Sequence, residues 1–232
     1  FKNEALQSIV ATVKKNGSAL HLMGLVSPGG VHSHSNHLYG LLELAKKEGI
    51  QKVYVHAFLD GRDVPPSSAA EYLADLEAKI KEIGVGQIAT ISGRYYAMDR
   101  DKRWERIREA YDLLVHGRGT VTGNILQAMQ DSYDAGVTDE FMKPIVVTGD
   151  SGKPLATIAP GDVVIFINFR NDRARELTIV LTQQDMPEAG MKTIPLHYLT
   201  MTPYDDKFKG LNIIFPKDNV EHTLGEILGD LG

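Results

Sequence analysis

Two kinds of apolar pattern alternate along the first hundred residues of the chain. Apolar positions three and four residues apart, typical of helices, recur in residues 4–15, 37–47 and 67–84. Nearly unbroken apolar runs, typical of buried parallel strands, occupy residues 18–26, 53–59 and 87–92. Strands that alternate with helices in this way predict right-handed parallel units, and therefore an α/β fold with a mostly parallel sheet.

The second half of the chain continues the pattern less regularly. Helical spacing predicts helices over residues 104–115, 125–135, 174–183 and 223–231. Apolar runs predict a strong strand over residues 163–169 and weaker strands over 196–200 and 212–215. Short extended pieces are expected over residues 144–158, with a hairpin around residues 149–152. Because no repeat, low-complexity segment or linker interrupts the pattern, we expect one domain over residues 1–232.

Composition excludes several functional classes. The 232 residues carry a net charge of −5, which argues against a general nucleic-acid binder. The absence of cysteine excludes a disulfide framework and thiolate chemistry, and no apolar run approaches the roughly 20 residues that span a membrane. The chain begins at Phe1 and stops directly after a helical pattern, so we expect it to be a segment of a longer protein.

Polar, glycine-rich or arginine-rich turns follow the predicted strands. The run at residues 53–59 ends in Asp60-Gly61-Arg62-Asp63, where Gly61 permits a turn that a residue with a Cβ would resist. Half of the ten arginines lie just after predicted strands: Arg62, Arg94, Arg100, Arg170 and Arg173. If the strands are parallel, these turns share one edge of the sheet, where ligands bind in open α/β folds.

Five convergent guanidinium groups predict a ligand with several negative charges, because arginine binds phosphate and carboxylate groups through two parallel hydrogen bonds. Asp63, next to Arg62, could accept or donate a proton there. The alternative is that each arginine is a surface charge paired with a carboxylate. The candidate partners are Asp63, Asp99, Asp101 and Asp172.

The histidines suggest further chemistry. His32, at a strand end, is interpreted as a hydrogen-bond donor to an anion or as a proton carrier. We expect His34 and His37 to be cap or surface residues and His56 to lie in the core, and we predict no metal site, because no recognisable ligand motif surrounds them. No catalytic nucleophile is evident. An anion-binding module without chemistry and a metal hydrolase built on the histidines remain alternatives.

Four motifs resemble one enzyme family in order and spacing. GLVSPGGVHSH, HAFLDGRDVPP, ISGRYYAMDRDKRW and FINFRNDRARE resemble the cofactor-independent (2,3-bisphosphoglycerate-independent) phosphoglycerate mutases, and the resemblance covers essentially the whole chain. One departure is Pro28, where relatives often have Asp or Ala. The resemblance implies a three-layer α/β/α sandwich with helices on both faces of the sheet. This would be the substrate-binding phosphotransferase domain, which is inserted into an alkaline-phosphatase-like domain absent from this chain.

The resemblance also implies a reaction, and it implies which residues and ions of the site belong to this chain and which to the absent domain. The complete enzyme would interconvert 3-phosphoglycerate and 2-phosphoglycerate through a phosphoserine, and that serine and two manganese ions would belong to the absent domain. Asp63 would be catalytic, and the isolated chain would bind but not catalyse. The resemblance further implies a cytoplasmic, monomeric glycolytic enzyme. Its substrate-binding residues would be His32, Arg62, Asp63, Arg94, Arg100, Arg170 and Arg173.

Overall fold

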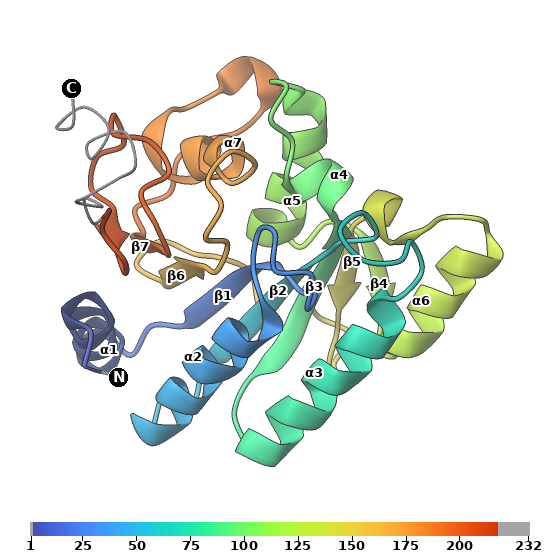
Figure 1. Cartoon of the computed structure of the whole chain (residues 1–232), viewed down its shortest axis with the longest axis horizontal. Coiled ribbons are helices and arrows are strands. Elements are labelled where there is room, and N and C mark those ends of the chain that lie inside the picture. The colour runs from blue at the N-terminus through green and yellow to red at the C-terminus, as the bar shows by residue number, and fades with distance from the viewer. Residues whose placement is uncertain (1, 218–232) are drawn as a thin grey trace, which may run out of the picture.

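The computed structural model describes residues 2–217 and consists of one eight-stranded sheet with helices on both faces (Figure 1). Along the sheet the strands follow the order β4-β5-β3-β2-β1-β6-β7-β8. All neighbouring pairs are parallel except β3 and β5, which are antiparallel. The predicted mostly parallel α/β fold is therefore confirmed.

The strands and helices begin and end close to the predicted positions. The strands are β1 (Leu20–Leu25), β2 (Val53–Leu59), β3 (Gln87–Gly93), β4 (Thr120–Thr122), β5 (Ile145–Val147), β6 (Val163–Phe166), β7 (His197–Thr200) and β8 (Asn212–Ile213). The α-helices are α1 (Glu4–Asn16), α2 (Ser35–Lys47), α3 (Ala69–Ile83), α4 (Arg94–Ala97), α5 (Trp104–His116), α6 (Ile125–Asp134) and α7 (Arg175–Thr178).

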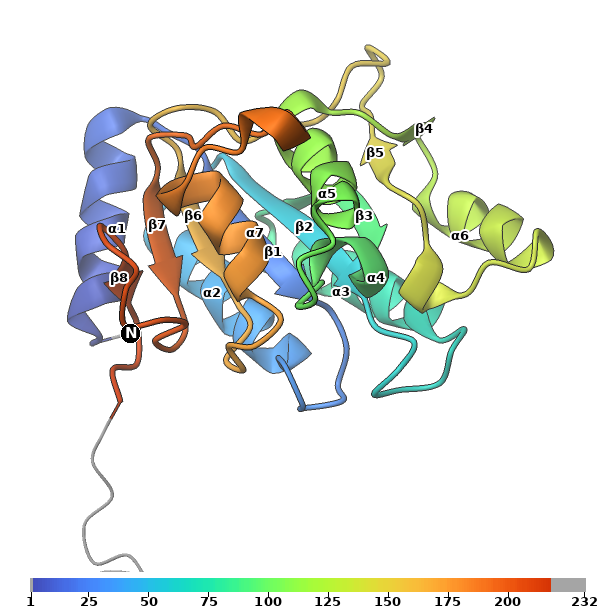
Figure 2. The ribbon, with the colours of Figure 1, turned by 90° about the horizontal axis from the view of Figure 1, so that it is seen from above.

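Two hydrophobic clusters separate the three layers. One cluster packs α1, α2, α3 and α6 against the sheet, with Leu22 and Leu42 fully buried. The other packs α4, α5 and α7 against the opposite face, where Met23 and Phe166 are fully buried. Successive residues of β1 thus contribute to opposite cores, as the period-2 geometry of a strand requires, and Figure 2 shows the sheet between the two helical layers. The implied three-layer sandwich is confirmed.

Three predictions differ from the structure. Strand β5 and the antiparallel bridge between Thr148 and Pro154 lie where short extended pieces and a hairpin were expected, but β4 was not predicted, and β5 pairs antiparallel with β3. The helix expected over residues 174–183 is one α-helical turn continued by a π-helical segment, Ile179–Gln183. The strand expected to reach residue 169 ends at Phe166. The helix expected over residues 223–231 lies outside the described residues.

The chain changes direction across the sheet at β1. The connections from β1 to β2 and β3 run toward one edge, whereas β6, β7 and β8 extend toward the other. The loops that follow β1 and β6 leave the sheet side by side, and the His32 carbonyl of the first accepts the Phe169 amide of the second at 2.8 Å. In open α/β sheets this switch point is where a crevice for ligands forms. Within the described residues, no helix is long and apolar enough to cross a membrane.

A short 3-10 helix, Asp139–Phe141, packs against the ends of β2 and β3. Gly61 has a φ of 62°, and a Cβ there would lie 2.8 Å from the amide nitrogen of Glu140, so the turn after β2 accepts only glycine without rearrangement. The buried Asp139 carboxylate accepts the amides of Ser68 and Ala69 at 2.9 Å each. Asp139 thus caps α3, while Ser68, which directly precedes the helix, makes no side-chain cap hydrogen bond.

Candidate functional site

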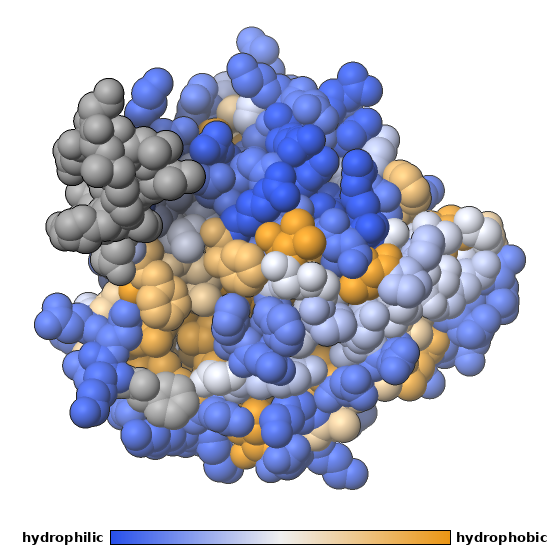
Figure 3. Space-filling view, viewed as in Figure 1, coloured by the Kyte–Doolittle hydropathy of each residue, from blue (hydrophilic) through white to orange (hydrophobic). Residues whose placement is uncertain are grey.

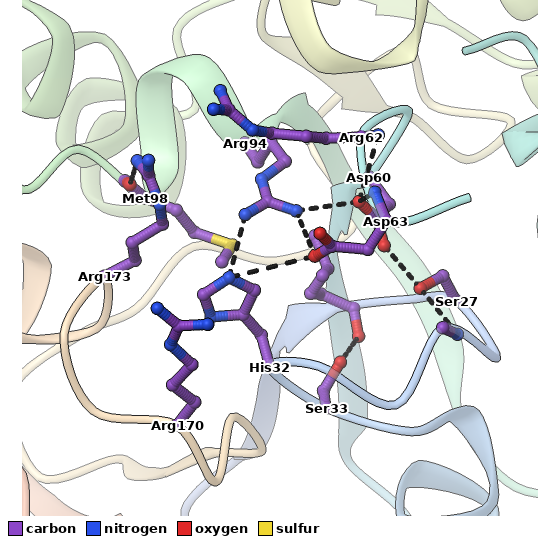
Figure 4. A network of polar contacts seen from close by, with 12 residues as sticks. Ser27, His32, Ser33, Asp60, Arg62, Asp63, Arg94, Met98, Arg170 and Arg173 are labelled. Carbon is purple, nitrogen blue, oxygen red and sulfur yellow. Dashed lines mark hydrogen bonds and ion pairs between the residues drawn. The ribbon is translucent and has the colours of Figure 1, made fainter. Parts of the chain in front are cut away.

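The loops after β1, β2 and β6 leave the same edge of the sheet (Figure 2). They carry His32, the Arg62–Asp63 pair and the Arg170–Arg173 segment, and α4 begins with Arg94 directly after β3. Figure 4 shows His32, Asp63, Arg94, Arg170 and Arg173 gathered around one point. The predicted convergence follows from the parallel strands, which bring turns from distant parts of the sequence to one edge.

Arg94 forms the centre of this group. Its side chain is 3% exposed, and its Nη1 donates to Asp60 Oδ1 at 2.7 Å and to Asp63 Oδ2 at 2.6 Å (Figure 4). Its Nη2 donates to His32 Nε2 at 2.9 Å. A buried guanidinium needs such partners because an uncompensated charge away from water is costly.

Asp60 anchors the turn, and sequence analysis did not select it. Its Oδ1 accepts the backbone amides of Arg62 and Asp63, and its Oδ2 accepts the Ser27 hydroxyl at 2.7 Å. These donors and Arg94 together hold the pKa of Asp60 below its usual value although burial opposes ionisation. An Asp two residues before an Arg at the end of an apolar run was the available signal, because such an Asp is placed to bind turn amides.

His32 presents a hydrogen-bond donor with no protein partner. Because the Arg94 guanidinium always donates, His32 Nε2 accepts and a neutral ring carries its proton on Nδ1. Nδ1 is buried without a hydrogen-bond partner and lies 3.9 Å from an Asp172 oxygen. Burial, followed by the charge of Arg94, lowers the pKa of His32 to about 4, so the ring is neutral near pH 7.

The other arginines surround this buried group at its rim. Arg100 and Arg170 both bind the Asp172 carboxylate, with nitrogen–oxygen distances of 2.8 and 2.9 Å. Arg62, with 57% of its side chain exposed, points away from Asp63 and pairs with Glu140 at 3.2 Å. The sequence analysis did not foresee Glu140 as a partner, because 78 residues separate it from Arg62.

Arg173 lies close enough to the other arginines for their charges to affect its pKa. Its Nη1 donates to the Met98 carbonyl at 3.1 Å. Burial first, and then the charges of Arg100, Arg94 and Arg62, lower the pKa of its guanidinium. Figure 3 shows hydrophilic side chains gathered over α4, α5 and the loops beside them. The arginines therefore converge at one edge of the sheet, as one interpretation of the sequence expected. Most of them also pair with carboxylates, as the alternative interpretation expected.

His21, His34, His37 and His56 lie outside this group. His34 caps α2 through its Nδ1, and the exposed His37 contacts the edge of Phe169. His56 is fully buried, as predicted, between His21 Nδ1 at 2.9 Å and the Thr90 hydroxyl at 2.8 Å. His21, which sequence analysis did not select, continues to Asp162.

The chemistry of the site favours anion binding over metal chemistry. Among residues 2–217, no three His, Asp or Glu side chains are grouped as a metal ion would need. The carboxylates at the site, Asp60, Asp63 and Asp172, are instead occupied by guanidinium groups. Donors to an anion come from the Nδ1–H of His32 and from the four arginines at the rim, Arg62, Arg100, Arg170 and Arg173. Asp63, with 19% of its side chain exposed, can exchange a proton with such an anion.

Comparison with known proteins gives consistent matches. The family model described as "BPG-independent PGAM N-terminus" matches residues 1–206. Over the whole chain, 57% of residues are identical to the protein of Parabacteroides distasonis named 2,3-bisphosphoglycerate-independent phosphoglycerate mutase. The protein of the same name from Clostridium kluyveri is 53% identical.

The chain spans less than half of these relatives, 46% of the Parabacteroides protein and 45% of the Clostridium protein. Among solved structures, a Leishmania mexicana phosphoglycerate mutase crystallised at low cobalt concentration superposes with a TM-score of 0.86. That match has 32% sequence identity and covers 98% of this chain but 43% of the Leishmania chain.

Proposed function

This chain belongs to the BPG-independent phosphoglycerate mutase family, and we propose that it is the part of such an enzyme that holds phosphoglycerate. In this proposal residues 1–232 form the substrate-binding phosphotransferase domain. The complete polypeptide interconverts 3-phosphoglycerate and 2-phosphoglycerate in glycolysis, as a cytoplasmic monomer. The alkaline-phosphatase-like remainder supplies the serine that carries the phosphoryl group transiently.

The observation that supports this proposal best is the group of arginines around an unpartnered donor. His32 Nδ1–H is buried without an acceptor, and burial followed by the charges of Arg100, Arg94 and Arg62 lowers the pKa of Arg173. A ligand with a carboxylate and a phosphate would satisfy the donor and relieve the repulsion among the cations. Phosphoglycerate carries both groups.

The two manganese ions implied by the resemblance do not fit the described part of this chain, because residues 2–217 contain no suitable ligand cluster. We therefore assign the ions to the remainder of the polypeptide and derive no step through them. The chemistry left to this chain is retention and orientation. While the phosphoryl group is on the serine, the arginines keep the glycerate from escaping and allow it to turn.

Asp63 is the residue that we propose as the proton carrier. Transfer of the phosphoryl group to and from glycerate requires a hydroxyl proton to leave and return. The Asp63 carboxylate lies at the opening of the buried group, 3.8 Å from His32 Nε2, and Arg94 fixes its orientation through a 2.6 Å hydrogen bond. A carboxylate within hydrogen-bond reach of the substrate contributes a factor of about 10² to 10⁴ in rate.

The substitution Asp63→Asn tests holding and chemistry together, because it keeps the shape and removes the base. Calorimetric titration of this chain with 3-phosphoglycerate should show binding for both proteins, with the variant binding equally well or more tightly. In the complete enzyme the same substitution should lower kcat by about 10²-fold or more. Glycerol, which lacks both acidic groups, should not bind to either.

Two results would contradict the proposal in different ways. A chain that binds no 3-phosphoglycerate, alone or in the complete enzyme, would remove the holding function. A complete Asp63→Asn enzyme with unchanged kcat and a raised KM would leave the holding function in place but assign the proton to another residue.

A further inference from the structure

Two arginine-bearing segments are joined by a carboxyl group that the site description has not used. The loop of residues 98–103 carries Arg100, and the segment of residues 170–176 carries Arg170 and Arg173. Glu176, only 6% exposed, reaches across from α7, and its Oε1 accepts the amide of Lys102 at 2.8 Å. Lys102 adopts a φ of 58°, a left-handed conformation that is uncommon for residues other than glycine. A strained residue of this kind persists only where its surroundings hold it.

The partner of Glu176 is a second buried carboxyl. Asp99, 2% exposed, binds the same stretch of backbone: its Oδ2 accepts the amides of Asp101 and Arg103 at 2.9 Å each, on either side of the Lys102 amide that Glu176 binds. Its Oδ1 accepts from Arg106 at 3.2 Å. Two buried carboxylates that bind adjacent amides repel each other when both are ionised, and one shared proton removes that repulsion. Glu176 Oε2 is the oxygen able to carry it, because Oε2 is buried without any donor and Oε1 is already occupied.

We propose that Glu176 is a positioning residue whose proton, shared with Asp99, holds the Arg100 loop against the segment that carries Arg173. The role in positioning arginines for phosphoglycerate rests on the proposed function, whereas the proton-dependent contact itself does not. Two further contacts join the same segments: Arg100 with Asp172 at 2.8 Å, and Arg173 with the Met98 carbonyl at 3.1 Å. Glu176 is the buried member of the three and the one that a proton controls.

The charges around the pair assign the proton to Glu176. Burial and the neighbouring Asp99 raise the pKa of Glu176 to about 7, while the three donors to Asp99 lower the pKa of Asp99 against its burial. The acidic groups that act on Glu176 are Asp99 and Asp101 of the loop, Lys102 binds it through its backbone amide, and Arg106 of α5 binds Asp99. Because the folded pKa of this acid is raised, the stability that the contact contributes is full below the ordinary value of 4.5 and is lost as pH rises to about 7.

The substitutions Glu176→Gln and Glu176→Ala separate the proton from the side chain. A Gln amide accepts from Lys102 and donates permanently to Asp99, whereas Ala does neither. Glu105→Gln, on an exposed side chain paired with Arg103, is the matched control. Hydrogen exchange of the Lys102 and Arg103 amides, followed by NMR from about pH 5 to about pH 9, reports the contact in this chain without substrate.

In wild type and in the control, protection of these amides should fall about tenfold for each unit of pH between about 5 and about 7 and then level off, beyond the normal base dependence of exchange. Protection should stay constant in Glu176→Gln and be absent at every pH in Glu176→Ala. Carboxyl ¹³C shifts should place the Glu176 midpoint near 7. Parallel profiles for wild type and Glu176→Gln, or a Glu176 midpoint near the ordinary 4.5, would overturn the proposal.

The consequence for substrate is measured separately by titration with 3-phosphoglycerate. Between about pH 6 and about pH 8, wild-type affinity should fall about tenfold relative to Glu176→Gln, which cancels the titration of the ligand itself. Equal pH dependence in the two proteins would overturn the positioning role even if the proton-dependent contact is present. If neither protein binds phosphoglycerate at any pH, the proposed function and this positioning role fail, whereas the exchange data decide the contact independently.

Discussion

The molecule has two buried polar networks, one in the loops at the edge of the sheet and one on its strands, and they differ in whether every polar group has a partner. Around Arg94, the network of Asp60, Asp63 and His32 ends in a buried Nδ1–H that has no partner and opens toward several arginines. On β1, β2 and β3, the second network runs from Asp162 through His21 and His56 to Thr90, and each imidazole nitrogen in it has a partner.

The difference indicates how to distinguish a site from a structural network. In the second network neutral rings suffice: His21 Nε2 donates to Asp162, His56 Nε2 donates to His21, and the Thr90 hydroxyl donates to His56. Burial, followed by His21, lowers the pKa of His56 well below its usual value, so this ring stays neutral. A complete network stabilises the fold, whereas an incomplete one leaves a donor for a ligand.

The largest expected effect on stability comes from Arg94, although it belongs to the incomplete network. Arg94→Leu leaves the Asp60 and Asp63 carboxylates without their counter-ion. Removal of one partner of a buried ion pair costs about 3–5 kcal/mol, and the free energy of unfolding should fall by that amount. Urea unfolding followed by the fluorescence of Trp104, the single tryptophan, measures it. As a control, Arg62→Leu should change the value by less than about 1 kcal/mol, because the Arg62–Glu140 pair is largely exposed.

An intermediate effect is expected in the second network. His56→Leu leaves His21 Nδ1 and the Thr90 hydroxyl unpaired in the core, and it should lower the free energy of unfolding by about 1–3 kcal/mol. Affinity for 3-phosphoglycerate should not change, since no residue of this network reaches the arginines. His37→Leu, on an exposed ring, serves as the control. A His56→Leu protein with normal stability but weakened binding would invalidate the distinction drawn between the two networks.

The smallest effect on free energy is expected at the rim. Arg62→Lys keeps the charge but removes the planar fork, so 3-phosphoglycerate affinity should fall about tenfold, or about 1.4 kcal/mol, without loss of stability. Arg118→Lys, at an exposed arginine paired with Asp112 beyond the far end of α5, should leave affinity unchanged. NMR shifts that map to the exposed face of α5, and not to Arg62 and Arg94, would show that the ligand binds elsewhere.

Sequence patterns predicted the elements that depend on local periodicity. The helices at residues 4–16 and 104–116 and the strand at residues 53–59 agree with their apolar spacing to within one residue. The convergence of Arg62, Arg94 and Arg170 followed from the parallel topology alone. The roles assigned to the site residues are predictions, which the substitutions above test.

The features that sequence analysis missed depend on contacts between distant residues. Strand β4 has three residues, too few to show a period. The sequence identifies Asp60 only as part of a turn, because its hydrogen-bonded ion pair with Arg94 joins residues 34 positions apart. The sequence around Glu176 does not reveal its buried contact, because the partner amide of Lys102 lies 74 residues away.

The cap that Asp139 provides for α3 has a consequence for the order of folding. A helix normally satisfies its first amides with a neighbouring side chain, and its start then forms without the rest of the protein. Here the amides of Ser68 and Ala69 are bound by the Asp139 carboxylate, which lies 71 and 70 residues later in the sequence. Tyr133 of α6 donates to the same carboxylate. The contact closes a long loop, and such contacts form late because loop closure is entropically unfavourable. The first turn of α3 should therefore acquire its protection with α6 rather than with the remainder of its own helix.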